Sequence, residues 1–421
     1  MSQVAGVILA AGKGTRMHSD EPKVLHQLCG EALLYYVIST MREAEIHQIY
    51  TVVGYAHEKV EASFKNEPVY WVYQGEQRGT GHAVSVTASF LGDFEGIVLV
   101  LYGDAPLITA ETLKKLIQTH QTNKDTVATV LTTIVNNPNG YGRIIRNETG
   151  QVIAIVEDTE AKDEEKKIKE INSGIYAFNS QIVFDALKRI KPNPKNGEYQ
   201  LTDVISLFVK KGERVEALIA PDANECLGIN SRDELVNASR IMQERIQHRL
   251  MNQGVTIIDP AKTYIENNVT IGADTVIYPF TVIRSGVKIG RHCEVGPFSH
   301  LRKGTVLDDH AEVGNFTEAK QTKLGKHSKA KHLSYLGDAV IGDDVNIGAG
   351  TITANFDGEK KHKTVIEDGA STGSGTILIA PVKLGREAVT GAGAVVTKGD
   401  NVPKATTVVG IPAKPLKKKK E

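Results

Sequence analysis

The pattern of apolar and polar positions changes character along the 421 residues of the chain. The first half alternates short apolar runs, which are typical of buried strands, with stretches whose apolar residues recur at helical spacing. Predicted strands cover Val4–Leu9, Ile49–Val53, Val69–Tyr73, Ile97–Leu101 and Val127–Val135, and the clearest predicted helices cover Ala32–Ala44 and Ala110–His120. This alternation predicts an α/β, Rossmann-like domain with a largely parallel sheet and with ligands at the carboxyl ends of its strands.

Residues 231–254 have the marks of one long helix. Ser231 and Glu234 have the spacing of a capping box, and Gly254 suits the left-handed position that ends many helices. Four apolar residues share one face of this helix, namely Leu235, Met242, Ile246 and Leu250. We interpret it as the linker between two domains.

Beyond the linker, aliphatic residues recur at a strict spacing of six, which neither a helix nor a hairpin sheet produces. The positions are Ile265, Ile271, Ile277, Ile283, Ile289, Val295, Leu301, Leu307 and Val313. The period predicts a parallel β-helix of six or seven coils, in which each side of a coil points one aliphatic side chain inward.

The six-residue period is broken at two places. Its phase slips around residues 319–347, and the polar segment Asn355–Thr364 interrupts it before Ile366 resumes it. A loop that leaves a regular coil is a common place for function. A prism of this kind leaves faces uncovered, so we expect an oligomer. Residues 401–421 are predicted to be a basic tail that ends in Lys417–Lys420.

Composition and charge exclude several classes of protein. Lys+Arg and Asp+Glu number 50 each, so no net charge attracts nucleic acid or a membrane surface. Three distant cysteines argue against a disulfide framework or a zinc site. No stretch approaches the length of a membrane span, and the apolar start is too short for a secretory core. We therefore expect a cytoplasmic protein that acts on small molecules.

Two loops that follow predicted strands carry groups suited to a nucleotide. After the first strand come Gly12-Lys13-Gly14-Thr15-Arg16 and then Lys23. The glycines let backbone amides approach phosphate oxygens, and the two cations at Arg16 and Lys23 supply positive charge, although the spacing is not that of a Walker A motif. Gln74 and Gln77 precede the Gly79-Thr80-Gly81 turn and offer amides to the edge of a pyrimidine base.

The predicted strand Ile97–Leu101 is soon followed by Asp104, whose carboxylate is a candidate Mg²⁺ ligand. Each of these three motifs alone is more often an ordinary turn. Their succession in one domain favours a nucleotide site.

In this order, the motifs resemble bacterial bifunctional N-acetylglucosamine-1-phosphate uridylyltransferase / glucosamine-1-phosphate acetyltransferase, and the resemblance spans residues 4–400. It implies a nucleotidyltransferase domain (1–230), the linker helix (231–254), a left-handed parallel β-helix acetyltransferase domain (255–400) and the tail (401–421). The implied enzyme transfers acetyl from acetyl-CoA to glucosamine 1-phosphate. It then transfers uridylyl from UTP to N-acetylglucosamine 1-phosphate. Mg²⁺ is the implied cofactor and a homotrimer the implied assembly.

The resemblance assigns the uridylyl site residue by residue, with Arg16 and Lys23 as catalytic cations. The implied nucleotide-binding residues are Leu9, Ala10, Ala11, Gly12, Lys23, Gln74, Gly79 and Thr80. The implied sugar-phosphate residues are Tyr102, Gly142, Glu157 and Asn172, and the implied Mg²⁺ ligands are Asp104 and Asn230. Arg78 departs from the family, which more often has a small or apolar residue there.

The resemblance assigns the acetyl site in the same way, with His332 as the general base that takes a proton from the sugar amine. The implied sugar-phosphate residues are Arg302, Lys320, Tyr335, Asn346 and Lys361, and the implied acetyl-CoA residues are Ala349, Asn355, Phe356, Ser374 and Ala392.

Departures from the family collect in this second half. Phe356 replaces a tyrosine, and residues 367–372 lack the expected apolar and aromatic side chains. Thr372 and Thr390 point inward, where each hydroxyl needs a hydrogen-bond partner. Residues 410–414 lack an arginine that contacts CoA, for which Lys414 or the lysine tail is a substitute.

Two other functions agree with the same sequence. One is nucleotidyl transfer alone, with the β-helix as a trimerisation stalk. The other is a non-catalytic scaffold or sensor that binds a nucleotide sugar. A lone histidine such as His332 is more often structural than catalytic, so thiol release from acetyl-CoA and pyrophosphate release from UTP separate the three hypotheses.

Overall fold

The computed structural model describes residues 3–416 and divides into two compact units, Met1–Ser239 and Arg240–Glu421. Lys417–Lys420, the end of the predicted basic tail, lies outside the described residues. Among the helices that the structure describes, none is both long and apolar enough to cross a membrane.

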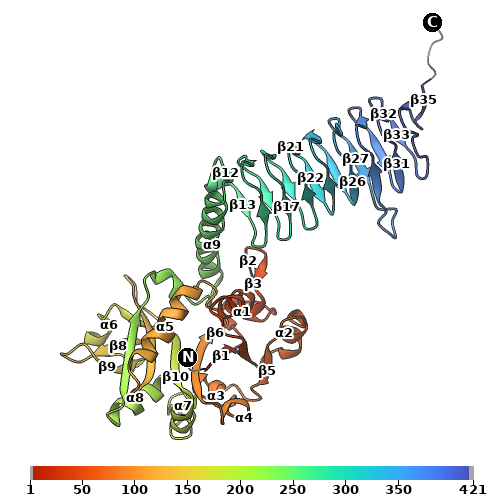
Figure 1. The fold of residues 1–421 in the computed structure, drawn as a ribbon. Coiled ribbons are helices and arrows are strands. Elements are labelled where there is room, and N and C mark those ends of the chain that lie inside the picture. The colour runs from red at the N-terminus through yellow and green to blue at the C-terminus, as the bar shows by residue number, and fades with distance from the viewer. Residues whose placement is uncertain (1–2, 417–421) are drawn as a thin grey trace. The chain divides into compact units, whose positions relative to one another are not determined.

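The first unit is built on a nine-stranded sheet in the order β11-β7-β10-β6-β1-β4-β5, with β8 and β9 joined beside β10 (Figure 1). Its strands are β1 (Gln3–Ala10), β4 (Gln48–Val53), β5 (Tyr70–Tyr73), β6 (Gly96–Tyr102), β7 (Thr126–Ile134), β8 (Arg143–Arg146), β9 (Val152–Val156), β10 (Glu170–Asn179) and β11 (Arg214–Ile219), and a separate hairpin pairs β2 (Gln27–Leu28) with β3 (Glu31–Ala32). The predicted α/β class is confirmed. The sheet is mixed, because β10 runs antiparallel to both β6 and β7.

The central strand β1 is buried on both faces, which explains its unbroken apolar sequence. Val7 and Leu9 belong to one core, while Ile8 and Ala10 belong to a second core on the other face of the sheet. The helices of this unit are α1 (Leu33–Glu43), α2 (His57–Ser63), α3 (Thr80–Ser85), α4 (Ala88–Leu91), α5 (Ala110–Thr122), α6 (Asp163–Lys166), α7 (Ser180–Leu187) and α8 (Thr202–Lys210), with short 3₁₀ turns η1 (Thr15–Met17), η2 (Lys23–Leu25) and η3 (Ala223–Cys226).

The predicted helix that follows is α9 (Arg232–Asn252), and its first turn is capped as the sequence predicts. The Ser231 hydroxyl accepts the Glu234 N–H at 3.2 Å, and the Glu234 carboxylate accepts the Ser231 N–H at 3.0 Å. Gly254, just beyond the helix, has the expected positive φ of 92°.

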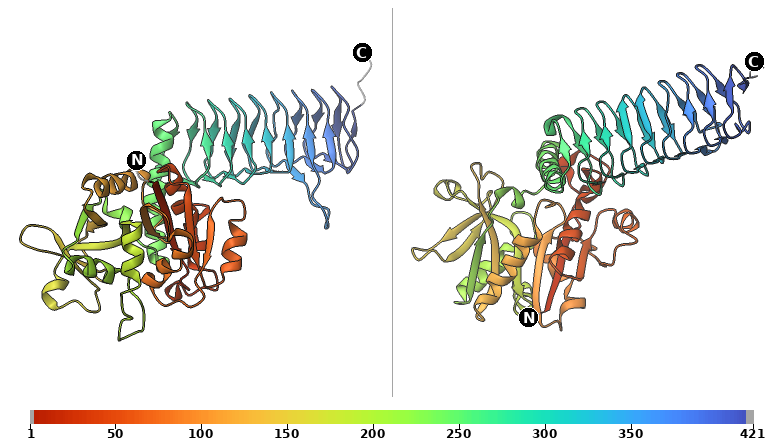
Figure 2. Two further views of the ribbon diagram at one scale, coloured as in Figure 1. Left: turned by 60° about the horizontal axis from the view of Figure 1, so that its bottom comes forward. Right: turned by 45° about the horizontal axis from the view of Figure 1, so that its top comes forward.

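The second unit is a parallel β-helix whose short strands stack coil upon coil (Figure 2). One face holds β12 (Thr256–Ile257), β15 (Val276–Ile277), β18 (Glu294–Val295), β21 (Glu312–Asn315) and β24 (Lys329–His332), and farther along β29 (Ser371–Thr372), β32 (Val389–Thr390), β34 (Thr407–Val409) and β35 (Lys414–Pro415). The next holds β13 (Tyr264–Ile265), β16 (Val282–Ile283), β19 (His300–Leu301), β22 (Glu318–Lys320), β25 (Tyr335–Gly337), β27 (Ile352–Ala354), β30 (Ile377–Ile379) and β33 (Val395–Val396). The last holds β14 (Thr270–Ile271), β17 (Lys288–Ile289), β20 (Val306–Leu307), β23 (Lys323–Leu324), β26 (Ala339–Ile341), β28 (Thr364–Ile366) and β31 (Val382–Leu384), and a 3₁₀ turn, η4 (Pro260–Lys262), precedes β13.

The aliphatic hexad positions point inward as predicted, and Ile265, Ile283 and Leu301 are fully buried. The expected six or seven coils were too few, because one face already carries eight paired strands. The count fell short because inward residues of this face such as Ala319 and Leu336, in β22 and β25, lie where the six-residue phase slips.

The slip in the hexad phase has a simple cause. Lys288 pairs with Val306, 18 positions on, whereas Val306 pairs with Lys323, only 17 positions on. The coil that begins here is one residue shorter and keeps its strands in register. Ala339 then pairs with Thr364, 25 positions on, because the intervening coil carries an additional loop.

The inward threonines Thr372 and Thr390 both have hydrogen-bond partners inside the coil. The Thr372 hydroxyl lies 2.9 Å from the Thr351 hydroxyl and accepts the Gly348 N–H at 2.9 Å. The Thr390 hydroxyl lies 2.8 Å from that of Thr376. These polar replacements therefore form hydrogen-bonded pairs within an otherwise aliphatic core.

We predict that Thr390→Val lowers the free energy of unfolding of the second unit by about 1 kcal/mol, because it removes the hydrogen bond between the buried Thr390 and Thr376 hydroxyls and leaves Thr376 only its bond to the Gly373 carbonyl. Thr364→Val is the matched control, because the Thr364 hydroxyl is buried and has no hydrogen-bond partner among the described residues. Thermal and denaturant unfolding measure both variants. Equal destabilisation by the two substitutions would contradict the prediction.

Candidate functional site

A cavity of about 660 Å³ opens in the first unit at the carboxyl ends of the central strands. Every residue that the sequence assigned to nucleotide, metal or sugar phosphate in this unit lines it, namely Leu9, Ala10, Ala11, Gly12, Arg16, Lys23, Gln74, Gly79, Thr80, Tyr102, Asp104, Gly142, Glu157, Asn172 and Asn230. The parallel pairing of β1 with β6 brings the first loops together, since Leu9 lies beside Tyr102 in register. The Gly103 N–H also donates to the Leu9 carbonyl at 2.9 Å.

The loop after β1 folds back over the stem of Lys23. Gly14 has a φ of 68°, and a Cβ at this position would lie 2.6 Å from the Cβ of Lys23. Glycine is therefore required for both the backbone conformation and the close approach. This contact places the lysine beneath the loop whose amides are the expected phosphate cradle.

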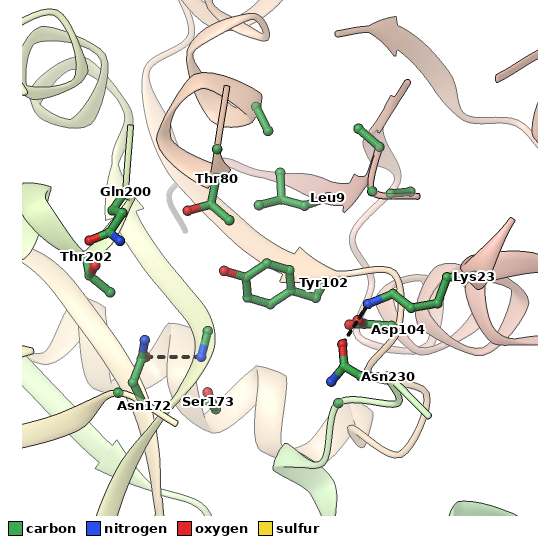
Figure 3. Close-up of a pocket in the computed structure, with 18 of the residues that line it drawn as sticks. Leu9, Lys23, Thr80, Tyr102, Asp104, Asn172, Ser173, Gln200, Thr202 and Asn230 are labelled. Carbon is green, nitrogen blue, oxygen red and sulfur yellow. Dashed lines mark hydrogen bonds and ion pairs between the residues drawn. The ribbon is translucent and has the colours of Figure 1, made fainter. Parts of the chain in front are cut away.

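The Lys23 ammonium lies between the two predicted metal ligands (Figure 3). It forms an ion pair with the Asp104 carboxylate and donates a hydrogen bond to the Asn230 side-chain oxygen at 3.0 Å. The backbone fixes this pair of oxygens, because the Ile229 N–H donates to the Asp104 carbonyl at 2.9 Å. Two hard oxygen donors thus already share one positive charge.

This donor set agrees with Mg²⁺, which usually binds one or two protein oxygens and takes its other ligands from water and substrate phosphates. Within residues 3–416, no group of three or more histidine, cysteine, aspartate or glutamate side chains is arranged to hold a metal by itself. Asp104 and Asn230 would therefore hold the ion only in company with phosphate oxygens.

The predicted base-binding loop is held by buried polar contacts. Gln74 is 2% exposed, and its amide nitrogen lies 3.3 Å from the Gly79 carbonyl and 3.0 Å from His82 Nδ1. Arg78, the departure from the family, lies over the ring of Tyr199 at 5.2 Å and does not line the cavity.

On the opposite side of the cavity, polar groups surround the predicted sugar position. Burial raises the pKa of the Glu157 carboxyl, which accepts a hydrogen bond from the Thr202 hydroxyl at 3.1 Å. Asn172 donates to the Tyr176 hydroxyl at 2.6 Å, and its side-chain oxygen accepts the Gly174 N–H at 3.1 Å. Burial and the Glu157 carboxylate raise the pKa of Tyr102, so its hydroxyl stays protonated.

The sequence did not single out the segment Glu198–Thr202, although Glu198, Gln200 and Thr202 line the cavity. Contacts far apart in sequence place it, since the Tyr199 carbonyl accepts the Gly81 N–H at 2.8 Å. The segment has no glycine and no periodic pattern, so its place at the cavity could be found only from this contact with Gly81.

In the second unit, three cations predicted to hold a sugar phosphate lie close together. Arg302 follows β19, which pairs in register with β22, and so lies beside Lys320. The Lys361 amine beside Lys320 and the nearby Arg302 guanidinium lower the pKa of Lys320. Mutual repulsion of this kind favours a bound anion.

The additional loop supplies Lys361 to this cluster. Phe356 and Lys361 pair across the loop as an antiparallel bridge, and Asp357 and His362 form an ion pair at 2.6 Å that closes it. Asn355 donates to the Asp338 carboxylate at the base of the loop.

The side chains of Tyr335 and Asn355 both lie against Gly337. A Cβ on Gly337 would lie 2.7 Å from both the Tyr335 hydroxyl and the Asn355 amide nitrogen. The structure thus brings Arg302, Lys320, Tyr335, Asn355, Phe356 and Lys361 to one edge of the β-helix.

His332 ends β24 on the adjacent face, and its side chain is exposed. Ala349, Ser374 and Ala392 continue its row along successive coils. The linking hydrogen bonds run from Gly350 N–H to the His332 carbonyl (3.4 Å), from Gly375 N–H to the Ala349 carbonyl (2.7 Å) and from Gly393 N–H to the Ser374 carbonyl (2.7 Å). Asn346 pairs with Lys329 and Ser371 on the His332 face. Within one chain, the predicted acetyl residues therefore form two groups.

Comparison with known proteins agrees with the division of the chain into two units. The sequence profile of the nucleotidyl transferase family matches residues 5–231. The profiles of the bacterial transferase hexapeptide (six repeats) and of the hexapeptide repeat of succinyl-transferase match residues 262–303 and 363–398.

Three similar proteins are each named bifunctional protein GlmU. That of Geobacillus sp. (strain WCH70) is 44% identical over 430 residues, covering 94% of this chain and 93% of the relative. That of Lactococcus lactis subsp. cremoris (strain SK11) is 46% identical, covering 96% and 94%. That of Heliobacterium modesticaldum is 42% identical, covering 94% of each.

We predict that Asp104→Asn weakens the binding of Mn²⁺ in the presence of a nucleoside triphosphate by roughly tenfold or more, because a carboxylate ligand is lost. Electron paramagnetic resonance of free Mn²⁺ measures the effect. Asp185→Asn, which changes an exposed carboxylate on α7, serves as the control. Unchanged Mn²⁺ affinity in Asp104→Asn would remove this residue from the metal site.

Proposed function

Because the chain belongs to the family of bifunctional GlmU proteins, we propose that its two units catalyse successive steps in the synthesis of UDP-N-acetylglucosamine. The chain is a uridylyltransferase and an acetyltransferase. The second unit acetylates glucosamine 1-phosphate with acetyl-CoA, and the first unit joins the product to the uridylyl group of UTP.

The convergence of separate loops on one cavity is the observation that carries the first assignment. A phosphate oxygen of N-acetylglucosamine 1-phosphate attacks the α-phosphorus of UTP in line. A new phosphorus–oxygen bond forms, and the bond to the departing pyrophosphate breaks. The protein aligns the reactants and neutralises charge through Arg16, Lys23 and the amides of the Gly12 loop.

The metal site supports this transfer. Asp104 and Asn230 would hold Mg²⁺, and the ion would supply positive charge that stabilises the leaving pyrophosphate. Lys23, which contacts both oxygens here, would then donate to a phosphate oxygen instead. Gln74 and the Gly79–Thr80 turn bind the uracil edge.

On the sugar side, Tyr102, Glu157 and Asn172 bind the amino sugar and its phosphate. Glu157 is half-buried and its oxygen accepts from Thr202, so its carboxyl is arranged to accept hydrogen bonds from sugar hydroxyls. The Gly142 carbonyl accepts the Asn172 N–H at 2.8 Å and fixes the relative position of the two segments.

The cation cluster of the second unit supports acetyl transfer. Arg302, Lys320 and Lys361 bind the phosphate of glucosamine 1-phosphate, and Tyr335 and Asn346 complete the sugar pocket. His332 takes a proton from the 2-amine, whose nitrogen attacks the thioester carbon of acetyl-CoA. A carbon–nitrogen bond forms, the carbon–sulfur bond breaks, and CoA leaves as the thiol.

The row of small residues beyond His332 is the proposed path of CoA. Ala349, Ser374 and Ala392 lead along successive coils toward the carboxyl end of the β-helix. There β35 pairs antiparallel with β34, and Lys414 lies opposite Val409. Lys414 is thus a cation at the end of the row, in the segment where the family arginine is missing, and we assign it to a CoA phosphate.

A homotrimer is the assembly that unites the two groups of acetyl residues. Beside His332, an exposed apolar strip runs along one corner of the β-helix. Phe280, Phe298 and Phe316 are 46 to 58% exposed, and their rings stack at 4.8 and 5.1 Å. On the coil that follows Phe316, the strip continues with Leu333, which is 63% exposed and comes directly after His332. We assign this strip to the contact between copies, which brings the loop of one copy to the His332 row of another.

We predict a double dissociation between the two activities. His332→Ala lowers thiol release from acetyl-CoA with glucosamine 1-phosphate by roughly 100- to 10 000-fold and leaves pyrophosphate release intact. Asp104→Asn has the reverse effect. His327→Ala, which removes an exposed histidine elsewhere on the β-helix, keeps both activities. Absence of thiol release in the wild type would leave only the nucleotidyltransferase, and absence of both signals would favour a non-catalytic scaffold.

We further predict that the double variant Phe298→Glu/Phe316→Glu is a monomer that has lost thiol release and keeps pyrophosphate release, because charge on the strip prevents association. Light scattering coupled to size exclusion measures the mass. His310→Glu is the control, since His310 lies in a stacked row of exposed histidines, with ring spacings of 4.9 and 4.7 Å, at another corner. A trimeric double variant would show that the strip is not the interface.

A further inference from the structure

Arg143 has the most unusual environment of the charged residues near the first cavity. Its side chain is fully buried, although the strand that carries it, β8, lies off the main path of the sheet. A buried guanidinium is costly unless it is paired, so a residue of this kind is retained for a specific contact. Arg143 is not among the residues that line the cavity.

The guanidinium joins two segments that are distant in sequence. It donates one hydrogen bond to the Tyr141 carbonyl and another, at 2.8 Å, to the Asp158 carboxylate. Asp158 also accepts the Gly140 N–H, and this backbone hydrogen bond is the main reason why the pKa of its carboxyl is lowered. The Arg143–Asp158 ion pair therefore clamps residues 140–142 to the end of β9.

Both segments end at the sugar side of the cavity. Gly142 precedes Arg143 directly, and Glu157 precedes Asp158 directly; both residues line the cavity. The clamp itself stays behind the wall, so it acts on the position of these groups and not on the substrate. Gly140 has a φ of 83°, a left-handed conformation that glycine adopts most easily.

We infer that Arg143 and Asp158 are positioning residues that set the distance between the Gly140–Gly142 backbone and the Glu157 carboxylate, and thereby the affinity for the amino-sugar phosphate. This inference rests on the proposed uridylyl transfer. It predicts an effect on one substrate only, because the nucleotide loops after β1 and β5 make no contact with the clamp in the hydrogen bonds and ion pairs of the described residues.

The test compares Asp158→Ala and Arg143→Lys with the wild type in steady-state pyrophosphate release. We expect the KM for N-acetylglucosamine 1-phosphate to rise roughly tenfold or more, while the KM for UTP changes less than about twofold. Asp158→Asn keeps one acceptor oxygen but leaves the buried guanidinium without a counter-charge, so it restores only part of the affinity. The unchanged KM for UTP and the far-ultraviolet circular dichroism spectrum check in the same samples that the first unit is folded.

Arg146→Ala is the matched control. Arg146 lies on the same strand and forms a bidentate pair with Glu170, at 2.8 and 2.5 Å, that does not reach the cavity. If the clamp is merely structural, Arg146→Ala and Asp158→Ala change the KM values alike or raise both of them, which overturns the inference. If the wild type releases no pyrophosphate, the proposed function itself fails, and that outcome is distinct from an unchanged KM in the variants.

Discussion

The central interaction of the first unit is the contact of one cation, the Lys23 ammonium, with two side-chain oxygen atoms. Asp104 follows β6 and Asn230 precedes α9, yet the Lys23 ammonium contacts both side chains. Repulsion between unpaired oxygens would push these segments apart, whereas a shared positive charge holds them. In the proposed function, the same arrangement would accept a divalent ion with a triphosphate, because the lysine could transfer its contacts to phosphate oxygens. The charges of the site would therefore be balanced only when the divalent ion and the triphosphate bind together.

In the second unit, positive charges are in excess where the first unit gathers oxygen atoms. Its proposed phosphate site gathers three cations, and Arg302 among them also donates to the Glu318 carboxylate at 2.7 Å. The stacking of coils fixes the spacing of these groups, since each pairs in register with the coil before it. A rigid strand stack thus maintains the charge repulsion that a flexible surface would relieve.

Features that depend on local periodicity could be predicted from the sequence. The capping box at Ser231 and the inward aliphatic residues of the β-helix are examples, because each repeats a spacing that only one structure satisfies. Strand β10 was missed, since a bulge between Asn172 and Ile175 interrupts its alternation. Among the cavity residues, Gly12 and Asp104 could be predicted because they follow apolar strands, whereas Gly142, Glu157, Asn172 and Asn230 came only from the resemblance to a known family. Arg143 and the Glu198–Thr202 segment could not be found, because their positions follow from contacts between distant parts of the chain.

The two activities consequently depend on different levels of organisation. All the assigned groups of uridylyl transfer line a cavity within residues 1–239, so a single chain contains them. The assigned groups of acetyl transfer lie on two edges of the β-helix, with His332 on one and Lys320 on the other. A rigid prism cannot bend these edges toward each other, since its coils are locked by register. In the proposed trimer, acetylation therefore requires association while uridylylation does not, and dilution below the dissociation constant of the trimer would separate the two reactions without any change of sequence.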